Sequence, residues 1–220
     1  TCITAPETTE GPYYINDEIV RTDLRENQTG VTLILDIGVI DINTCEPLSD
    51  AFVELWAANA TGVYSSYTAT LGGGDFVSSN ETFLRGGYPT NSQGVVELTT
   101  IYPGFVRGRT MHVHTMVHLN YELNSNGTLA SHTGSLIHIG QLFANESWND
   151  AVYNTSPYTT DTNERTYNAD DSIYAAANTA GYNAEMDIVM LGSDISDGLL
   201  GYITIGVDST ATYSITNTNY

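Results

Sequence analysis

Short runs of β-branched and aliphatic residues, broken by turns, dominate this chain and restrict the folds that it can adopt. The second half of the run 31–42 alternates apolar and polar residues, as expected for a strand with one buried face. Clusters of Gly and Asn separate the runs, for example at 72–74 and 124–127. Such a series predicts an all-β fold, a β-sandwich or a barrel. The expected strands are 31–42, 51–56, 94–101, 110–119, 136–143, 186–191 and 199–207.

Helical signals are few and short. Residues 146–153 begin with an acidic turn and residues 172–179 are rich in Ala, so each segment predicts a short helix. Residues 1–30 predict an extended N-terminal arm, and 154–185 form a polar stretch rich in Tyr and Asn. Because no repeat or linker divides the sequence, we expect a single domain over residues 1–220.

The charge balance excludes several classes of function. The 220 residues include 26 Asp and Glu but only 6 Lys and Arg, all of them Arg, which gives a formal net charge of -20. A polyanion of this kind repels nucleic acids and anionic membrane surfaces. No apolar run approaches the ~18 residues of a membrane span. The hydrophobic fraction of 41% is nevertheless sufficient for a sizeable core.

Cysteines and glycosylation signals favour an extracellular protein. The chain opens with Thr1 and Cys2 rather than with Met, which is typical of a processed N-terminus. Cys2 and Cys45 predict one disulfide between the arm and the first strand pair, with two free buried thiols as the alternative. Sequons of the type N-x-S/T favour a secreted glycoprotein. They start at Asn27, Asn59, Asn80, Asn126, Asn145 and Asn154.

The segment 109–114, Arg-Thr-Met-His-Val-His, carries the strongest chemical signal. Side chains alternate along a strand, so His112 and His114 leave the same face roughly 6–7 Å apart and can converge on one metal ion. A polar, partly exposed face is the alternative. His118 lies on this face if the strand continues, but we interpret it as a polar residue at the strand end. The chain also has 15 Tyr residues, and a phenolate is a hard ligand suited to Fe(III).

Four blocks of sequence, in order, resemble the intradiol ring-cleavage dioxygenases, in particular the secreted fungal branch of these catechol and protocatechuate dioxygenase-like proteins. The resemblance implies a β-sandwich that holds a non-haem ferric ion between two Tyr and two His. It also implies that both atoms of O₂ are inserted between the two hydroxylated carbons of a catechol, giving a muconate-type diacid. The blocks are PETTEGPYY at 6–14, VELWAANATGVY at 53–64, TIYPG at 100–104 with GRTMHVH at 108–114, and GQLF at 140–143.

The resemblance also implies roles for individual residues. Tyr64, His112 and His114 match metal ligands of the family. Arg109 matches a pocket residue that steadies the negative charge on a substrate carbon. The implied catalytic and substrate-binding residues are Arg109, Gln141, Pro12 and Tyr14.

One ligand of the family is missing from this chain. The family places its second Tyr ligand two residues after the Pro-Gly turn, where this chain has Val106. An aliphatic side chain cannot bind a metal, so we expect a weakened Fe(III) site, with another metal or none as alternatives. Tyr102 is a possible replacement, although it should end the preceding strand and point elsewhere.

These observations predict a secreted intradiol-type dioxygenase with non-haem Fe(III) that cleaves a catechol or related polyphenol. Two alternatives stay open. One is an enzyme on the same scaffold that acts on an aromatic or polyketide-like metabolite without inserting O₂, and the other is a non-catalytic glycoprotein that binds a metal or a phenol. The expected partner is a small aromatic substrate, with no nucleic acid and no membrane, and the protein is expected to be a monomer or a homodimer.

Overall fold

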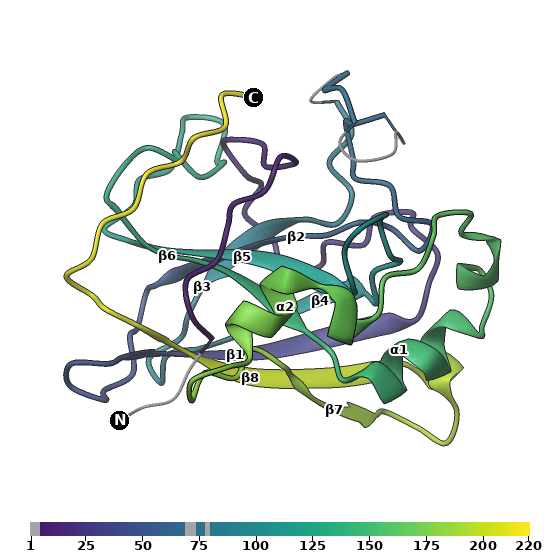
Figure 1. The fold of residues 1–220 in the computed structure, drawn as a ribbon. Coiled ribbons are helices and arrows are strands. Elements are labelled where there is room, and N and C mark those ends of the chain that lie inside the picture. The colour runs from purple at the N-terminus through teal and green to yellow at the C-terminus, as the bar shows by residue number, and fades with distance from the viewer. Residues whose placement is uncertain (1–4, 69–73, 78–79) are drawn as a thin grey trace.

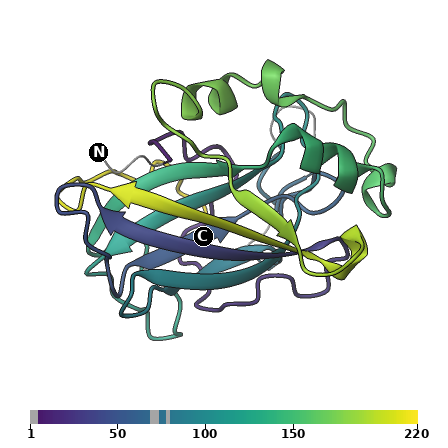
Figure 2. The same ribbon diagram turned by 90° about the horizontal axis from the view of Figure 1, so that it is seen from below.

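The computed structural model describes residues 5–68, 74–77 and 80–220. Two four-stranded sheets have the strand orders β4-β1-β8-β7 and β3-β2-β5-β6 and lie face to face (Figure 1, Figure 2). This arrangement is the predicted β-sandwich. The strands are β1 (Thr32–Asp41), β2 (Phe52–Trp56), β3 (Arg85–Pro89), β4 (Val95–Ile101), β5 (His112–Leu119), β6 (Ser135–Phe143), β7 (Asp187–Met190) and β8 (Leu199–Val207).

Strand β1 shows how the first sheet forms the main core. It pairs antiparallel with β4 and parallel with β8. Every second residue of β1 is buried, and Leu33, Leu35 and Ile37 belong to the main apolar cluster between the sheets. The residues between them are half-buried on the outer face. This period of two is the pattern that made the strand recognisable in the sequence.

The second sheet is buried on both of its faces. Every residue of β2 is buried, and in β5 only the last residue is not. Val53 and Val113 face inward and join the main core, whereas Trp56 and Met116 on the opposite face belong to a second apolar cluster. The arm and the loop after β2 complete this second cluster. The outer face of the second sheet is therefore an interior surface.

The N-terminal arm and the C-terminal tail lie side by side over this outer face. From residue 5 onward, the N-terminal arm runs to β1 without a helix or strand. The buried carboxylate of Glu10 accepts hydrogen bonds from the backbone N–H groups of Thr216 (2.8 Å) and Asn217 (2.9 Å). The backbone N–H of Asn16 donates to the carbonyl of Asn219 at 2.8 Å. The C-terminal tail therefore holds the arm in place (Figure 1).

The predicted strands and helices are confirmed, with ends that shift by at most two residues: α1 spans Glu146–Tyr153 and α2 spans Ser172–Ala177. The remaining helical segments are single 3₁₀ turns, η1 (Tyr158–Thr160), η2 (Asn168–Asp170) and η3 (Ile195–Asp197). Within the described ranges, no helix has the length and hydropathy needed to cross a bilayer.

Strand β3 is absent from the predicted strands. Its sequence, Arg-Gly-Gly-Tyr-Pro, has the composition of a turn. It forms because β2 supplies antiparallel partners along its whole length, so that long-range pairing overrides local preference. Cys2 and part of the turn expected at 72–74 lie outside the described residues, and the disulfide between Cys2 and Cys45 stays a prediction.

Candidate active site

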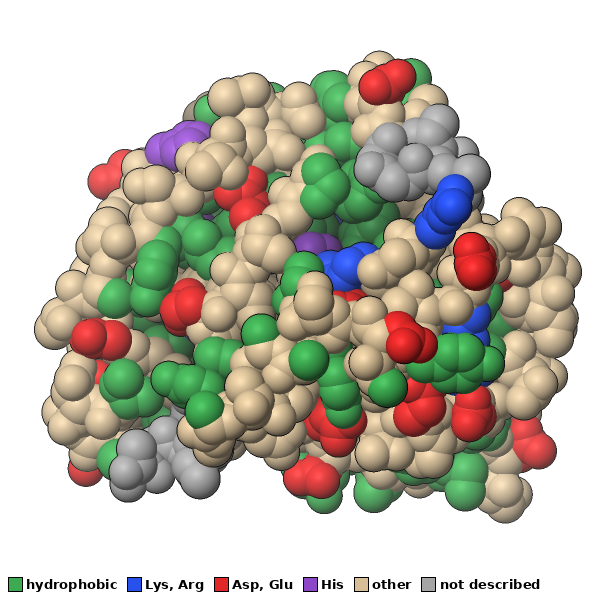
Figure 3. All heavy atoms as spheres, viewed as in Figure 1, with side chains coloured by type: hydrophobic (Ala, Val, Ile, Leu, Met, Phe, Trp, Pro, Cys, Tyr) green, Lys and Arg blue, Asp and Glu red, His purple; other side chains and the backbone are tan. Residues whose placement is uncertain are grey.

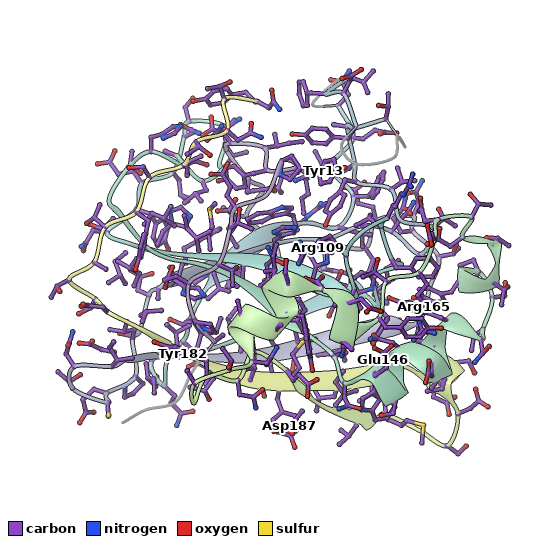
Figure 4. All side chains as sticks on the ribbon, in the orientation of Figure 1. Tyr13, Arg109, Glu146, Arg165, Tyr182 and Asp187 are labelled. Atoms are coloured by element: carbon purple, nitrogen blue, oxygen red, sulfur yellow. The ribbon has the colours of Figure 1, made fainter. Side chains whose placement is uncertain are left out.

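A cavity of about 330 Å³ opens on the outer face of the second sheet. Figure 3 shows a hollow near the centre of the molecule, where a purple His and a blue basic side chain lie among hydrophobic groups. Figure 4 labels two residues of its walls, Tyr13 from the arm and Arg109 from the turn before β5. The lining residues are Thr9, Gly11, Pro12, Tyr13, Gly62, Val63, Tyr64, Tyr67, Thr68, Val106, Arg107, Gly108, Arg109, His112, His114, Asn163 and Ile173.

The structure brings the three expected metal ligands to this cavity. His112 and His114 leave the same face of β5, and their ring centroids are 4.8 Å apart. The Oη of Tyr64 lies 3.1 Å from Nε2 of His112. Nδ1 of His112 donates to the carbonyl of Thr110 at 2.7 Å, because a carbonyl can only accept. Nε2 of His112 therefore carries the free lone pair and points toward Tyr64, which is the arrangement of a metal-binding imidazole.

His114 is held by its neighbours rather than by hydrogen bonds. Its ring stacks on the indole of Trp56, with centroids 4.8 Å apart and planes 7° from parallel. Gly11 of the arm passes close to this ring, so that a Cβ at Gly11 would lie 2.8 Å from Cε1 of His114. Gly11 also has a φ of +74°, which disfavours other residues. The Gly of the arm motif is therefore required for the arm to cover His114. Nδ1 of His114 is buried without a hydrogen-bond partner among the described residues.

The charge states of these groups follow from their burial. Burial, together with the positive charge of Arg109, lowers the pKa of His112 to about 3. Burial and the neighbouring His112 also lower the pKa of His114 well below its ordinary value. Burial raises the pKa of Tyr64 above its ordinary value, against the opposing charges of Arg109 and Arg85. Both imidazoles are thus neutral at physiological pH, as metal binding requires, and Tyr64 is a neutral phenol until a cation displaces its proton.

This donor set fits a hard trivalent ion. The described part of the chain has no group of three or more His, Cys, Asp or Glu side chains placed to hold a metal. A metal centre in the cavity would need an oxygen donor beside the two imidazoles, and the phenol of Tyr64, 3.1 Å from Nε2 of His112, is placed to supply it. Two nitrogen donors and one phenolate oxygen suit Fe(III) better than a soft ion.

Val106, at the position where the resemblance led us to expect a second Tyr ligand, lies in the cavity wall. Val106 and Arg109 are the ends of a turn closed by the N–H of Arg109 donating to the carbonyl of Val106 at 3.2 Å. Gly108 in this turn has a φ of +82°, which favours glycine. A Cβ at this position would meet no described atom within 4 Å. The glycine is therefore required by the backbone conformation of the turn and not by a close contact. Val106 packs against the second apolar cluster and lines the cavity. The side chain of a Tyr at position 106 would therefore leave the backbone from this wall of the cavity.

Tyr102, the possible replacement, does not reach the cavity. Its side chain is fully buried in the main core, and its hydroxyl donates to Oδ1 of Asn149 at 2.6 Å. It is not among the residues that line the cavity. As expected from its place at the end of the preceding strand, it points away from the site.

Arg109 is fixed by two partners behind the cavity wall. Its Nε donates to Oδ2 of Asp171 at 2.8 Å, and its Nη2 donates to Oε1 of Gln141 at 2.6 Å. The amide of Gln141 in turn donates to the carbonyl of Thr9 at 3.0 Å. Gln141 is fully buried and does not line the cavity, so its contact is with Arg109 and the arm. It therefore orients the guanidinium rather than touching a bound molecule.

Asp171 was missed by the sequence analysis. Its Oδ2 accepts from Arg109 and from the backbone N–H of Thr110, and its Oδ1 accepts from the N–H groups of Ile173 and Tyr174. Burial raises its pKa, but the charge of Arg109 and these N–H groups outweigh burial and lower the pKa overall. The only sequence signal for this role is an Asp directly before the helix predicted at 172–179, which indicates a helix N-cap.

The arm contributes Tyr13 rather than Tyr14 to the cavity. The ring of Tyr13 stacks on Tyr64, with centroids 4.3 Å apart and planes 15° from parallel, and its hydroxyl accepts from the N–H of Gly74. Tyr14 is fully buried, its hydroxyl lies 3.0 Å from Oγ of Ser131, and it does not line the cavity. Pro12 lines the cavity as expected.

His118 is a polar residue near the end of β5, as the sequence suggested. It is fully buried on β5, and its Nε2 lies 2.9 Å from Oε2 of Glu54, which is also fully buried. A shift in the pairing of β5 with β6 occurs between Val117 and His118. His118 is therefore a partner of a buried carboxylate and not a third histidine of the cavity.

Comparison with known proteins shows which family the chain resembles. Residues 3–127 match the family model Dioxygenase_C, described as Dioxygenase. A segment of 103 residues, 44% of this chain, is 30% identical to catechol 1,2-dioxygenase 1 of Acinetobacter lwoffii and spans 31% of that protein. The structure of an intradiol ring-cleavage dioxygenase from Tetranychus urticae superposes with a TM-score of 0.82 at 29% identity, covering 96% of this chain and 98% of that one.

A more distant structure shares the fold. Catechol 1,2-dioxygenase from Pseudomonas arvilla C-1 has a TM-score of 0.57 and 19% identity, covering 98% of this chain and 67% of that one. The family model covers more than half of the present chain. The chain therefore belongs to the intradiol ring-cleavage dioxygenase family.

Proposed function

We propose that this protein is a secreted, non-haem Fe(III) dioxygenase that opens the ring of a catechol or related polyphenol between its two hydroxylated carbons. The observation that carries the proposal is the approach of Tyr64 Oη to His112 Nε2, 3.1 Å, in a cavity that also contains His114. Tyr64, His112 and His114 would hold the ion. When bound, Fe(III) would supply a Lewis acid for the two catechol oxygens and couple the ring to O₂.

The other residues of the cavity bind and orient the substrate. Pro12, Tyr13 and Val63 provide a largely apolar wall against which an aromatic ring can pack. Arg109 presents a guanidinium whose position is fixed by Asp171 and Gln141. A fixed cation of this kind stabilises negative charge that develops on the substrate ring without having to reorganise during the reaction.

Among the described residues, the cavity offers no carboxylate that could accept the protons of a catechol. Its lining includes no Asp or Glu from that part of the chain, and Val106 occupies the position from which the family's second Tyr would act. Tyr64 loses its own proton when the ion binds. The catechol protons would therefore pass to the Tyr64 phenolate or to water at the cavity mouth, and turnover should accelerate as the pH rises toward ionisation of the substrate.

The presence of Val106 instead of a second Tyr also favours a second candidate function. A site that lacks the fourth protein ligand could serve an enzyme that binds hydroxylated aromatics but does not insert O₂, or a protein that only binds them. The two functions differ in product: ring cleavage gives a diacid and consumes one O₂ per catechol, whereas the second candidate does neither.

Secretion is part of the proposal because sequons lie on exposed residues. The side chains of Asn126, Asn145 and Asn154 are exposed. An oxidising compartment would also suit the two cysteines.

The test is metal analysis of the native protein, followed by oxygen uptake with catechol and with hydroxyquinol. We expect bound iron, a red colour from tyrosinate bound to Fe(III), and one equivalent of O₂ consumed for each diacid formed. A colourless preparation without iron would remove the dioxygenase proposal. Bound iron with no ring-opened product would favour the second candidate.

A further inference from the structure

A second cavity, of about 310 Å³, lies beside the N-terminal arm and shares no lining residue with the candidate active site. Its walls include part of the arm, the first residue of β3 and the loop between β5 and β6. Three of its lining side chains are polar and almost fully buried: Asn16, Glu18 and Arg85 are 3%, 4% and 2% exposed. Polar side chains buried to this degree normally have hydrogen-bond partners for all of their polar atoms.

Each of these three side chains has a polar atom without a hydrogen-bond partner among the described residues. The atoms are Oδ1 of Asn16, Oε1 of Glu18 and Nη1 of Arg85. Oε1 of Glu18 and Nη1 of Arg85 are 3.8 Å apart, which is close enough for an ion pair but too long for a hydrogen bond. Because all three residues line the cavity, a molecule bound there could supply the missing partners.

Asn16 and Arg85 are held in place by their other polar atoms. The amide nitrogen of Asn16 donates to the carbonyl of Asn217 at 3.0 Å and to that of Asn219 at 2.9 Å. Nε of Arg85 donates to Oγ of Ser65 at 2.7 Å, and Nη2 donates to the carbonyl of Ser65 at 3.2 Å. One acceptor and one donor are therefore fixed beside the cavity, and such preorganisation lowers the cost of binding a ligand.

A neutral molecule with several hydroxyl groups fits these atoms. The cavity already contains a guanidinium and a carboxyl group, so the ligand needs no charge of its own. A hydroxyl group can both donate and accept. It therefore suits Glu18 with or without its proton, since burial raises the pKa of this carboxyl to about 8 against the charge of Arg85. Sugars combine such hydroxyl groups with apolar C–H faces, and Ile15 and Ile19 offer these faces apolar contacts.

The attachment point for a sugar lies at the edge of this cavity. Asn126, the first residue of a sequon, is exposed, and both Asn126 and Thr128 line the cavity. Oδ1 of Asn126 accepts from the N–H and the hydroxyl of Thr128. This arrangement leaves Nδ2, the atom to which an N-linked glycan is attached. Neither the candidate active site nor a third hollow, on the outer face of the first sheet, is lined by the Asn of a sequon.

We propose that the cavity is a carbohydrate-binding site in which Asn16, Glu18 and Arg85 bind the first N-acetylglucosamine of a glycan on Asn126. This sugar is neutral and carries hydroxyl groups and an amide. The inference rests on the secretion in the proposed function, because such a glycan is added during secretion. The covalent tether gives the sugar an effective concentration in the millimolar range, so that even a weak site is filled.

The experiment asks whether the protein's own glycan excludes a free sugar from the cavity. The protein is secreted from a eukaryotic host, its glycans are mapped, and binding of the methyl β-glycoside of N-acetylglucosamine is followed by NMR. Asn126→Gln lacks the tethered sugar, so we expect this variant to bind the free sugar with a Kd of about 1 mM. Nuclear Overhauser effects should connect the N-acetyl methyl group with Ile15 and Ile19. In the unaltered protein the same effects should come from the tethered sugar.

Asn145→Gln is the matched control. Oδ1 of Asn145 accepts from the N–H and the hydroxyl of Ser147, as Oδ1 of Asn126 does from Thr128, but Asn145 does not line the cavity. The Asn145 variant keeps the tethered sugar, which competes with the free one. We therefore expect it to bind the free sugar about tenfold more weakly than Asn126→Gln does.

Three outcomes would overturn the inference. If Asn126→Gln does not bind the free sugar, the cavity holds ordered water only. Equal binding by the two variants would mean that a glycan on Asn126 lies outside the cavity. An unmodified Asn126 beside other occupied sequons would refute the inference and leave secretion intact, whereas the absence of glycans from every sequon would also count against secretion. Iron content and oxygen uptake test the dioxygenase independently of all three outcomes.

Discussion

The hydroxyl of Tyr64 lies 3.1 Å from Nε2 of His112, although 48 residues separate them in the sequence. The contact exists because β2 and β5 are neighbours in the second sheet, with Trp56 paired opposite His114. The loop after β2 then returns over the face that carries the histidines. His112 is neutral, and Tyr64 keeps its proton when no metal is bound. Their hydrogen bond therefore holds both side chains in position to bind an ion.

Replacing Tyr64 by Phe should remove the metal site without unfolding the protein. The variant loses one oxygen donor, and we expect iron retention to fall by at least about tenfold, together with the visible colour. Tyr102→Phe is the matched control, because Tyr102 is also a buried Tyr whose hydroxyl has one partner. The iron content and visible absorption of Tyr102→Phe should equal those of the unaltered protein. Loss of iron in both variants would mean that Tyr64 has no special role.

Replacing Val106 by Tyr should strengthen the same site. The side chain starts from the cavity wall, and a second phenolate would neutralise more of the charge of Fe(III). We expect iron to survive dialysis against a chelator about tenfold longer, and the tyrosinate absorption to increase. Val106→Phe adds the same ring without the oxygen and controls for crowding. If the Tyr and Phe variants retain iron equally, the position does not face the metal.

The sequence was sufficient for most strands because they alternate in burial or consist of β-branched residues. It failed for β3, where Gly86 and Gly87 form a strand only through pairing with β2. It also failed in the arm, because an extended segment without ladder pairing has no regular side-chain alternation. The sequence therefore offered Tyr14 for the substrate pocket, whereas Tyr13 lines the cavity.

The sequence motifs identified the residues of the candidate site but not the residues that hold them in place. Arg109 and Asp171 are 62 residues apart, and no periodic pattern links them. Glu54 and His118 form a buried pair between β2 and β5, which makes His118 a structural residue although it follows the two candidate ligands on the same strand. Such contacts depend on which strands become neighbours, which local sequence does not specify.

Asp171→Ala should destabilise the fold more than the loss of an ordinary helix cap. One carboxylate binds Arg109, caps α2 and accepts from Thr110, so its removal leaves a partly buried cation unpaired. We expect the free energy of unfolding at pH 7 to fall by about 2–4 kcal/mol, as when one partner of a buried pair is removed. Asp194→Ala, which removes the exposed cap of η3, should cost no more than about 1 kcal/mol.

The effect of Asp171→Ala should also depend on pH. The pKa of this carboxyl is lowered in the folded protein, so its contribution is complete above the ordinary pKa and is lost as the pH falls through the folded-state value. Urea unfolding at pH 7 and at pH 3 measures both effects. Equal costs for the Asp171 and Asp194 variants at pH 7 would contradict this account.

Glycan occupancy should differ between the sequons. Asn126 is exposed, and its Oδ1 accepts from the N–H and hydroxyl of Thr128. Asn59 is half-buried, its Oδ1 accepts from Thr61 and Val63, and its Nδ2 donates to Gln28. Glycopeptide mapping of the protein secreted from a eukaryotic host should find a glycan on Asn126 and none on Asn59. The reverse pattern would contradict the exposed position of one or the burial of the other.

The metal-free protein should lose stability as the pH falls below about 6.5, the ordinary pKa of His. The pKa values of His112 and His114 are lowered in the folded state, His112 to about 3, so in acid the unfolded chain binds protons that the folded chain does not. The free energy of unfolding should then decrease by up to about 1.4 kcal/mol per pH unit for each histidine. Urea unfolding of chelator-treated protein between pH 7 and pH 4 measures this slope.

Changing both histidines to Gln should reduce the slope, whereas His132→Gln, at an exposed position, should not. An unchanged slope in the double variant would show that other groups cause the loss of stability in acid.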